Sequence, residues 1–155
     1  MIQDLFVFYL GEHRVGLVLD QVVRVFQAVE PMELPNAPDV VLGLVNVRGK
    51  LVPVVDVRAR FGLPTKEIST SDHMILAAGR ERELIFVVDS SVGVVATNVG
   101  ETFSDEKMDT KVPWLQAVLR TIDGVVFIHD FDKFLSFEEE GVLAVALRER
   151  VEDSE

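Results

Sequence analysis

Short apolar runs separated by turn residues recur along the whole chain, and this spacing constrains the fold more than any other feature. Each run is about five residues long, the length of a β-strand, whereas helices of ordinary length repeat their apolar residues every 3.6 positions. The chain is therefore predicted to be mainly β. The candidate strands cover residues 5–10, 15–19, 22–26, 42–47, 51–55, 74–78, 84–88, 92–96, 115–122 and 125–128.

Most of these runs are continuously apolar rather than alternating, so we expect their strands to be covered on both faces. Strand edges must also be closed or covered, and many short strands with few helices satisfy this by closing into barrels. Ten candidate strands are twice the number in a small five-stranded barrel. The pattern predicts two such barrels that share a seam, within one chain of 155 residues.

A C-terminal helix is expected to begin near Ser136. The pattern from Ser136 to Glu139 is that of a capping box, and Leu143 and Leu147 follow at helical spacing. This region, about residues 136–155, is strongly acidic and is interpreted either as a solvated helix with a tail or as a docking surface for a basic partner. A shorter helical turn is expected within residues 58–63, and mobile loops at residues 65–72 and 99–111.

The charge balance limits the classes of partner. Fifteen Lys and Arg residues stand against 26 Asp and Glu, a formal net charge of -11, and such a surface repels nucleic acid and anionic lipid. The apolar run near the N-terminus is too short for a signal sequence or a membrane span. There is no cysteine, which is compatible with a reducing compartment. We therefore expect a cytoplasmic protein with no nucleic-acid partner and no direct membrane insertion.

Motifs for catalysis are missing from the sequence. The three histidines, His13, His73 and His129, are far apart and lack the spacing of metal ligands. No nucleophile elbow or phosphate-binding loop is present either. The sequence therefore predicts neither an enzyme nor a cofactor. A carboxylate pair enclosed between the barrels, serving an enzyme or a small-ligand site, remains a remote alternative.

Polar residues embedded in two apolar strands are the most informative feature left. Asn46, Arg48 and Asp56 flank or follow a tight turn at Arg48 and Gly49, and each requires a hydrogen-bond partner. Two interpretations are open. Arg48 and Asp56 could pair as a latch across the hairpin, or Arg48 could stand exposed at its tip and anchor a protein partner.

The segment from residue 34 to residue 62 resembles the most characteristic block of the CheW-like family of chemotaxis coupling domains. The shared elements are Pro-x-x-Pro, a Gly before the strand, Asn-x-Arg-Gly at the turn, Pro-x-x-Asp in the next strand, Asp-x-Arg and Phe-Gly. Weaker similarity to the family covers about residues 4–137. The resemblance implies one CheW-like domain made of two intertwined five-stranded, SH3-like barrels with the acidic C-terminal helix appended.

The resemblance also implies a function. CheW-like proteins are non-enzymatic adaptors that join the regulatory domain of a histidine kinase to the cytoplasmic tip of a chemoreceptor. By position, Asn46, Arg48 and Gly49 correspond to the turn implicated in assembly, and Asp89 and Val92 to a strand end implicated in receptor contact. Asp56 and Arg24 are further candidates for partner binding. A helical receptor hairpin would lie in an apolar groove between the barrels.

Three features depart from the family pattern. Arg24 stands where a Glu is typical, so that its pairing with Arg48 would become repulsive, Ile85 stands where a Gly is usual, and the acidic helix is longer than the family core requires. A divergent interaction module that serves an accessory, non-chemotactic signalling or motility complex is therefore the alternative function.

Overall fold

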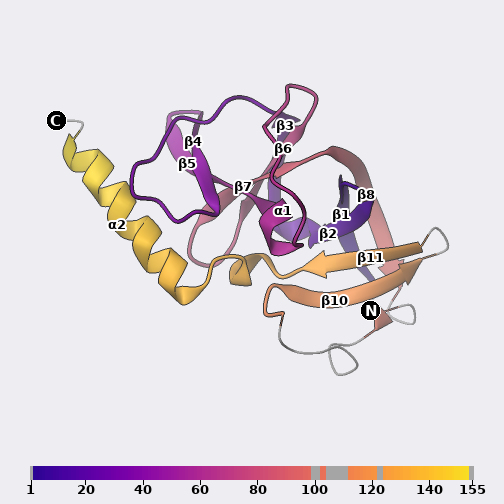
Figure 1. Ribbon diagram of the computed structural model, residues 1–155. Helices are drawn as coiled ribbons and strands as arrows, with labels where there is room; N and C mark the ends of the chain where they lie inside the picture. The colour runs from indigo at the N-terminus through magenta and orange to yellow at the C-terminus, as the bar shows by residue number, and fades with distance from the viewer. Residues whose placement is uncertain (1, 99–101, 104–111, 122–123, 154–155) are drawn as a thin grey trace.

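Two β-sheets and a long C-terminal helix make up this computed structural model, which describes residues 2–98, 102–103, 112–121 and 124–153 (Figure 1). In spatial order the first sheet contains β8 (Ser90–Asn98), β1 (Ile2–Leu10), β2 (His13–Val18), β11 (Gly124–His129), β10 (Leu115–Thr121) and β9 (Thr102–Phe103). The second contains β3 (Val22–Gln27), β6 (His73–Ala78), β7 (Glu83–Val88), β5 (Lys50–Val55) and β4 (Val41–Val47). All ten predicted strands are confirmed, and β9, only two residues long, was missed because it has no apolar run.

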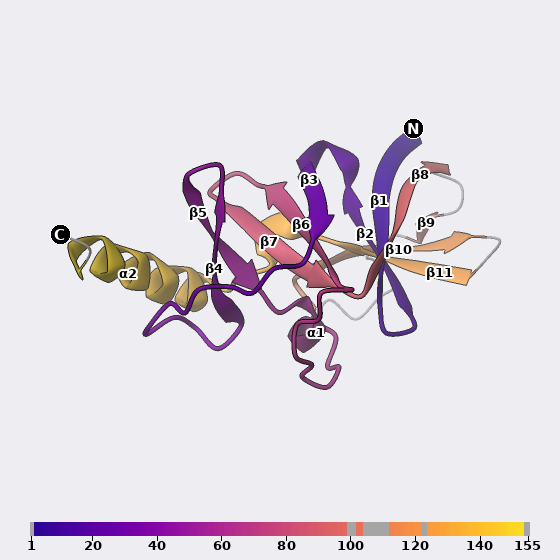
Figure 2. The ribbon, with the colours of Figure 1, turned by 90° about the horizontal axis from the view of Figure 1, so that it is seen from above.

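The chain enters the second sheet and then returns to the first. β1 and β2 begin the first sheet, β3 to β7 build the second, and β8 to β11 complete the first. Two parallel pairings follow from this path, β2 with β11 and β5 with β7, whereas the other strand pairs are antiparallel. Figure 2 shows the two sheets side by side, with β3 and β6 of the second facing β1 and β8 of the first. The sheets are therefore intertwined through the chain path.

Each sheet curls so that its two edge strands come from neighbouring parts of the chain, which is the arrangement of a small barrel. In the second sheet the chain that follows β3 closes the barrel. Met32 lies in this segment and exchanges two backbone hydrogen bonds of 2.7 Å with Leu44 of β4. Gly43 permits this approach, since a Cβ atom there would lie 2.3 Å from the carbonyl oxygen of Met32. The sheets are called the first and second barrel below, and the predicted fold class is confirmed.

Strands β1 and β7 bury both of their faces, whereas β3 and β8, from which the same was expected, leave valine side chains exposed. On β1, Leu5 and Val7 point into the first barrel, while Phe6 and Phe8 join a cluster that runs between the two barrels. On β7, Ile85 lies inside the second barrel and Phe86 in the same shared cluster. A strand that serves two cores cannot alternate polar and apolar residues, and this explains the continuous runs in the sequence.

Helix α2 (Phe137–Asp153) begins where the capping box predicted. The Ser136 hydroxyl accepts a hydrogen bond from the Glu139 N–H (3.1 Å), and the Glu139 carboxylate accepts one from the Ser136 N–H (2.8 Å). Leu143 is fully buried in the shared cluster, so the start of the helix packs on the body of the protein. In both ribbon views α2 projects from the side of the second barrel that holds β4 and β5 (Figures 1 and 2).

The remaining helical segments are short. Helix α1 (Val57–Arg60) lies close to the predicted turn, and two 3-10 turns, η1 (Leu19–Gln21) and η4 (Phe131–Lys133), link β2 to β3 and β11 to α2. No helix in the described part of the chain has the length and apolar content that a membrane crossing requires. Most of the predicted loop at residues 99–111 lies outside the described residues.

Candidate partner-binding groove

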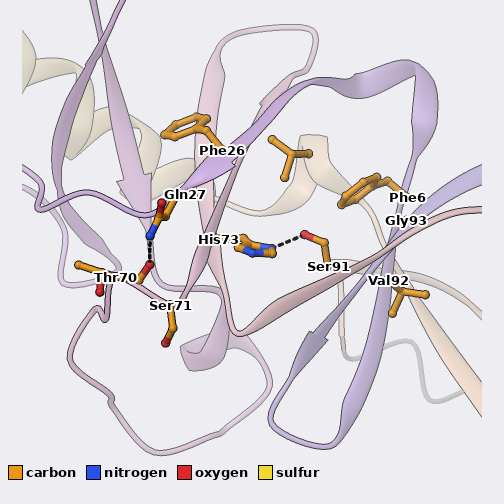
Figure 3. Close-up of a pocket in the computed structure, with 10 residues that line it drawn as sticks. Phe6, Phe26, Gln27, Thr70, Ser71, His73, Ser91, Val92 and Gly93 are labelled. Carbon is orange, nitrogen blue, oxygen red and sulfur yellow. Dashed lines mark hydrogen bonds between the residues drawn. The ribbon is translucent and has the colours of Figure 1, made fainter.

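A surface groove with a volume of about 510 Å³ lies between the two barrels (Figure 3). The first barrel contributes residues from β1 and β8, and the second contributes residues from β3, β6 and the loop that precedes β6. Its lining consists of Phe6, Val25, Phe26, Gln27, Thr70, Ser71, His73, Ser91, Val92 and Gly93. Because both barrels supply walls, the groove exists only through their relative placement.

Exposed valines make the walls and their surroundings apolar. On β3 the side chains of Val23 and Val25 are 57% and 37% exposed, and on β8 those of Val92 and Val94 are 45% and 59% exposed. Val25 and Val92 line the groove itself, while Val23 and Val94 lie on the same two strands outside its lining. Single exposed apolar residues are ordinary, but apolar side chains on both walls of one groove suit an apolar partner. The arrangement can bind an amphipathic helix through aliphatic contacts.

Two hydrogen bonds cross this region (Figure 3). The Nδ1 atom of His73 and the Oγ atom of Ser91 lie 2.7 Å apart and join β6 of the second barrel to β8 of the first. Gln27 donates from Nε2 to the carbonyl oxygen of Thr70 at 2.7 Å and fixes the loop beside the groove. The groove therefore combines apolar walls with a few oriented polar groups, as binding sites commonly do.

Val92 occupies a β-bulge. Val7 of β1 pairs with Gly93, and Phe8 pairs with Ser91, so Val92 is the extra residue on β8. Gly93 has a φ of 118°, which favours glycine, and the bulge redirects the neighbouring side chains. This local irregularity places Val92, a residue singled out from the sequence, in the lining of the groove.

Asp89 lies just before β8 and outside the groove lining. Its carboxylate accepts a hydrogen bond from Gly11 in the β1–β2 turn and two from Arg58 of α1, at 3.2 and 3.0 Å. Lys66 Nζ lies 3.5 Å from the same carboxylate. Burial alone would raise the pKa of Asp89, but the Gly11 hydrogen bond and the charges of Arg58 and Lys66 outweigh it and hold the pKa below its ordinary value. Asp89 therefore ties the first barrel to α1 and the following loop.

Lys66 also anchors the loop at residues 65–72. Its ammonium lies 2.6 Å from the buried carboxylate of Asp72, which in turn accepts a hydrogen bond of 2.8 Å from the Ser69 N–H. The backbone carbonyl of Asp72 accepts a further bond of 2.9 Å from the Ala28 N–H. These contacts fix the loop that supplies Thr70 and Ser71 to the groove.

Asp56 and Asp89 line one small pocket, which tests the idea of a carboxylate pair. The pocket has a volume of about 20 Å³, close to the space that one water molecule requires. Asp89 is already paired with Arg58 and Lys66. The two acids therefore do not offer an open site for acid–base catalysis. Within the described residues, no group of three or more His, Asp or Glu side chains could hold a metal ion.

Asn46, Arg48 and Gly49 lie together at the exposed tip of the β4–β5 hairpin, away from the groove lining. Val47 pairs with Lys50, so Arg48 and Gly49 form a two-residue turn, and their φ angles of 51° and 88° are those of a type I′ turn. The Asn46 side-chain oxygen accepts a hydrogen bond of 2.7 Å from the Gly49 N–H. Asn46 therefore shapes the turn, and Arg48 is presented to solvent.

The latch between Arg48 and Asp56 is not formed, so this interpretation was wrong. Arg48 precedes β5 and Asp56 follows it, and a six-residue strand separates its two ends by roughly 20 Å. Arg24 on β3 is also exposed. Among the described residues neither Arg24 nor Arg48 forms an ion pair, and both are exposed to solvent.

The residues selected from the sequence thus separate into three places. Val92 lines the groove, and Arg24 neighbours the groove residue Val25 on β3. Asp56 and Asp89 line the small pocket beside α1. Asn46, Arg48 and Gly49 form the hairpin tip. Sequence reasoning missed Phe26, His73 and Ser91, because they come from separate strands and no local motif marks them.

Comparisons with known proteins agree with this architecture. The profile of the CheW-like domain family matches residues 4–139. A chemotaxis protein CheW from Rhizobium meliloti is 26% identical over 141 residues, 88% of this chain and 90% of that protein. One from Bacillus subtilis is 27% identical over 99 residues, and that alignment spans only 64% of each chain. The crystal structure of the scaffolding protein TtCheW from Thermoanaerobacter tengcongensis is similar with a TM-score of 0.75 at 25% identity, covering 83% of this chain and 89% of that one.

Proposed function

The chain belongs to the CheW-like domain family, and we propose that it is a non-enzymatic chemotaxis adaptor that couples chemoreceptors to a histidine kinase. An adaptor works by binding alone, so it requires separate surfaces for its partners. The groove between the barrels and the tip of the β4–β5 hairpin are two such surfaces, and neither depends on a cofactor.

The groove is the surface that we assign to the cytoplasmic tip of a chemoreceptor. Its exposed valines on β3 and β8 would contact the apolar stripe of a receptor helix, and the groups around His73 and Ser91 would orient it. Val92 is central to this assignment, because its bulge places an apolar side chain at the border between the two barrels.

The hairpin tip is the surface that we assign to assembly with the regulatory domain of the kinase. Arg48 is exposed and has no ion-pair partner among the described residues, and its backbone adopts a positive φ that few residues tolerate. A guanidinium held in a defined turn can make bidentate contacts with a carboxylate of a partner.

Sedimentation with receptor-tip assemblies, with and without the kinase regulatory domain, tests this proposal. We expect Val92→Asp to weaken sedimentation with receptor tips at least tenfold, because it places a charge against an apolar helix. Val125→Asp is the matched control, since Val125 is similarly exposed, at 40%, on β11 outside the groove. Equal receptor binding by these two variants would contradict the assignment of the groove.

A second pair of variants tests the hairpin tip. Arg48→Asn removes the charge with a residue that accepts a positive φ, whereas Arg48→Lys keeps the charge and loses the planar guanidinium. We expect Arg48→Asn to remain folded and to weaken assembly with the kinase domain. If Arg48→Asn unfolds the protein while wild type binds neither partner, or if Arg48→Asn stays folded and assembles as wild type does, the anchor interpretation is wrong.

The alternative function, an interaction module for a non-chemotactic complex, rests on Arg24 in place of the family's typical Glu. An exposed cation on β3, next to the groove, would favour a more acidic helix than the usual partner. Binding of wild type to receptor tips distinguishes the two functions, because the adaptor function predicts binding and the alternative predicts none. If wild type binds, the adaptor function further predicts that Arg24→Glu keeps or improves that binding.

A further inference from the structure

The solvent-facing side of α2 carries exposed apolar side chains that belong to none of the hydrophobic clusters of the core. Phe137 is 98% exposed, and Val142 and Val145 are 42% and 44% exposed. Leu143 and Ala146, on the other side of the helix, are buried against the barrels. The helix is therefore apolar on two sides, whereas a helix that only covers its own core has one apolar stripe.

Gly141 lies between these exposed residues and has no structural reason to be glycine. A Cβ atom at this position would have no atom within 4 Å outside the local helix, and no positive φ requires glycine there. Glycine inside a helix costs about 1 kcal/mol relative to alanine. Positions 137, 141 and 145 are spaced four residues apart, so Gly141 forms a notch between Phe137 and Val145 on one face.

The charges around this face indicate what can cover it. α2 contains six acidic residues and two arginines. Glu139 and Glu140 turn inward to ion pairs with Arg60 and Arg82. The exposed charges on the outer side are the carboxylates of Glu138 and Glu149 and the guanidinium of Arg148, so the described part of this side keeps an excess of negative charge. A second copy of this chain, with a net charge of -11, would bring two acidic helices together. Charge complementarity therefore favours a basic partner.

We propose that the outer face of α2, formed by Phe137, Gly141, Val142 and Val145, docks a basic amphipathic helix of another protein. A bulky apolar side chain of that helix fills the notch over Gly141, between Phe137 and Val145. Lysine or arginine residues flank it and approach Glu138. This surface is separate from the groove and from the hairpin tip, so it does not depend on their assignments.

Fluorescence anisotropy of labelled synthetic helical peptides, titrated with the full chain, tests the proposal. The probe is a peptide with leucine along one face and lysine on both flanks. The first control peptide has the same leucines with glutamine in place of lysine, and the second has the same composition in a scrambled order. We expect the probe to bind at least fivefold more tightly than either control, and its affinity to fall as salt is added.

Variants of the protein locate the binding surface. Phe137→Ser and Gly141→Gln leave the net charge unchanged. Each should lower the affinity for the probe at least fivefold, and Gly141→Gln should do so by filling the notch. Val29→Ser is the matched control, because Val29 is 49% exposed and lines a pocket that contains no residue of α2. This variant should bind the probe as wild type does. Circular dichroism of each variant is the check that it is folded.

Two results would overturn the proposal. One is equal affinity of wild type, Phe137→Ser and Gly141→Gln for the probe, which would mean that the peptide binds elsewhere through charge alone. The other is a dimer in analytical ultracentrifugation that Phe137→Ser dissociates, which would mean that a second copy covers this face.

Discussion

His129 is fully buried, and neither of its ring nitrogens has a hydrogen-bond partner. Its ring stacks on Trp114 at a centroid distance of 5.5 Å and lies 5.4 Å from Phe86 and 5.5 Å from Phe134. Burial, helped by the charge of Arg60, outweighs the opposing effect of the Asp130 backbone and lowers the pKa of His129 to about 3. The side chain is therefore a neutral imidazole in an aromatic cage, and its N–H remains unsatisfied.

Replacing His129 by phenylalanine should stabilise the protein. At pH 7 we expect His129→Phe to raise the free energy of unfolding by about 1 to 2 kcal/mol, because it removes an unsatisfied buried polar group. The unfolded histidine has a pKa near 6.5, so between pH 6.5 and about 3 the unfolded chain binds one proton more than the native protein. Wild type should therefore lose up to about 1.4 kcal/mol per pH unit as the pH falls through this window, beyond any loss in His129→Phe.

Urea unfolding at pH 7, 5.5 and 4.5 measures this difference. The stabilities of wild type and His129→Phe should diverge as the pH falls. A constant difference across these values would mean that His129 is hydrogen-bonded or solvated in the native protein.

Single residues were only partly predictable from the sequence. Asn46 needed a partner and found it three residues away at Gly49, within reach of local reasoning. Asp89 found its partners at Gly11, Arg58 and Lys66, which are distant along the chain, and no local pattern could identify them. The same limit applies to Asp56: the expected pair with Arg48 fails because the two residues lie at opposite ends of β5, which the local sequence does not reveal.

At the scale of elements, the glycines of β4 and α2 should respond to alanine in opposite directions. Gly43→Ala would place a Cβ atom 2.3 Å from the Met32 carbonyl oxygen, which backbone movement must relieve. We expect it to destabilise the protein by about 1 to 3 kcal/mol. Gly141→Ala meets no neighbour and should stabilise it by up to about 1 kcal/mol.

Thermal unfolding shows whether Gly43→Ala lowers the melting temperature and Gly141→Ala raises it. Each variant is the control for the other. A stabilised Gly43→Ala would contradict the close approach of Met32 to β4. A destabilised Gly141→Ala would mean that position 141 has a packing role on the body of the protein.

Elements were the most predictable level of this structure. Strands that are apolar on both faces leave uninterrupted runs in the sequence, and the capping box of Ser136 and Glu139 marks the start of α2 within one residue. The two-residue β9 left no such signal. Helix α1 begins one residue before the predicted turn, because a single helical turn has too few positions to define a period.

For the whole molecule, we expect the two barrels to unfold together. The largest apolar cluster contains Phe8 of the first barrel and Phe86 of the second, so neither barrel can open without exposing the shared cluster. The single tryptophan reports on this seam, because the Trp114 ring, next to β10, lies 4.5 Å from the ring of Phe61, which follows α1. Urea transitions followed by tryptophan fluorescence and by far-UV circular dichroism should coincide.

Ile85→Val makes this test sharper. Ile85 lies inside the second barrel, and its truncation should cost about 1 kcal/mol. We expect the fluorescence and dichroism midpoints to fall by the same amount. A fluorescence midpoint that stays in place would mean that the first barrel and the seam remain folded after the second barrel unfolds.

The number of strands in the sequence predicted two barrels. The cluster that both barrels share could not be predicted, because its residues come from both halves of the chain and no local pattern marks them.

The chain path has a consequence for synthesis on the ribosome. β1 pairs with β8, and β2 pairs with β11 near the C-terminal helix, while the five strands between them pair among themselves. During translation the second barrel can therefore close while β1 and β2 still wait, as an isolated hairpin, for partners that have not been made. Until β8 and β11 are synthesised, the apolar side chains of this hairpin have no strand partners, so we expect translation to be the stage at which β1 and β2 are most prone to aggregate.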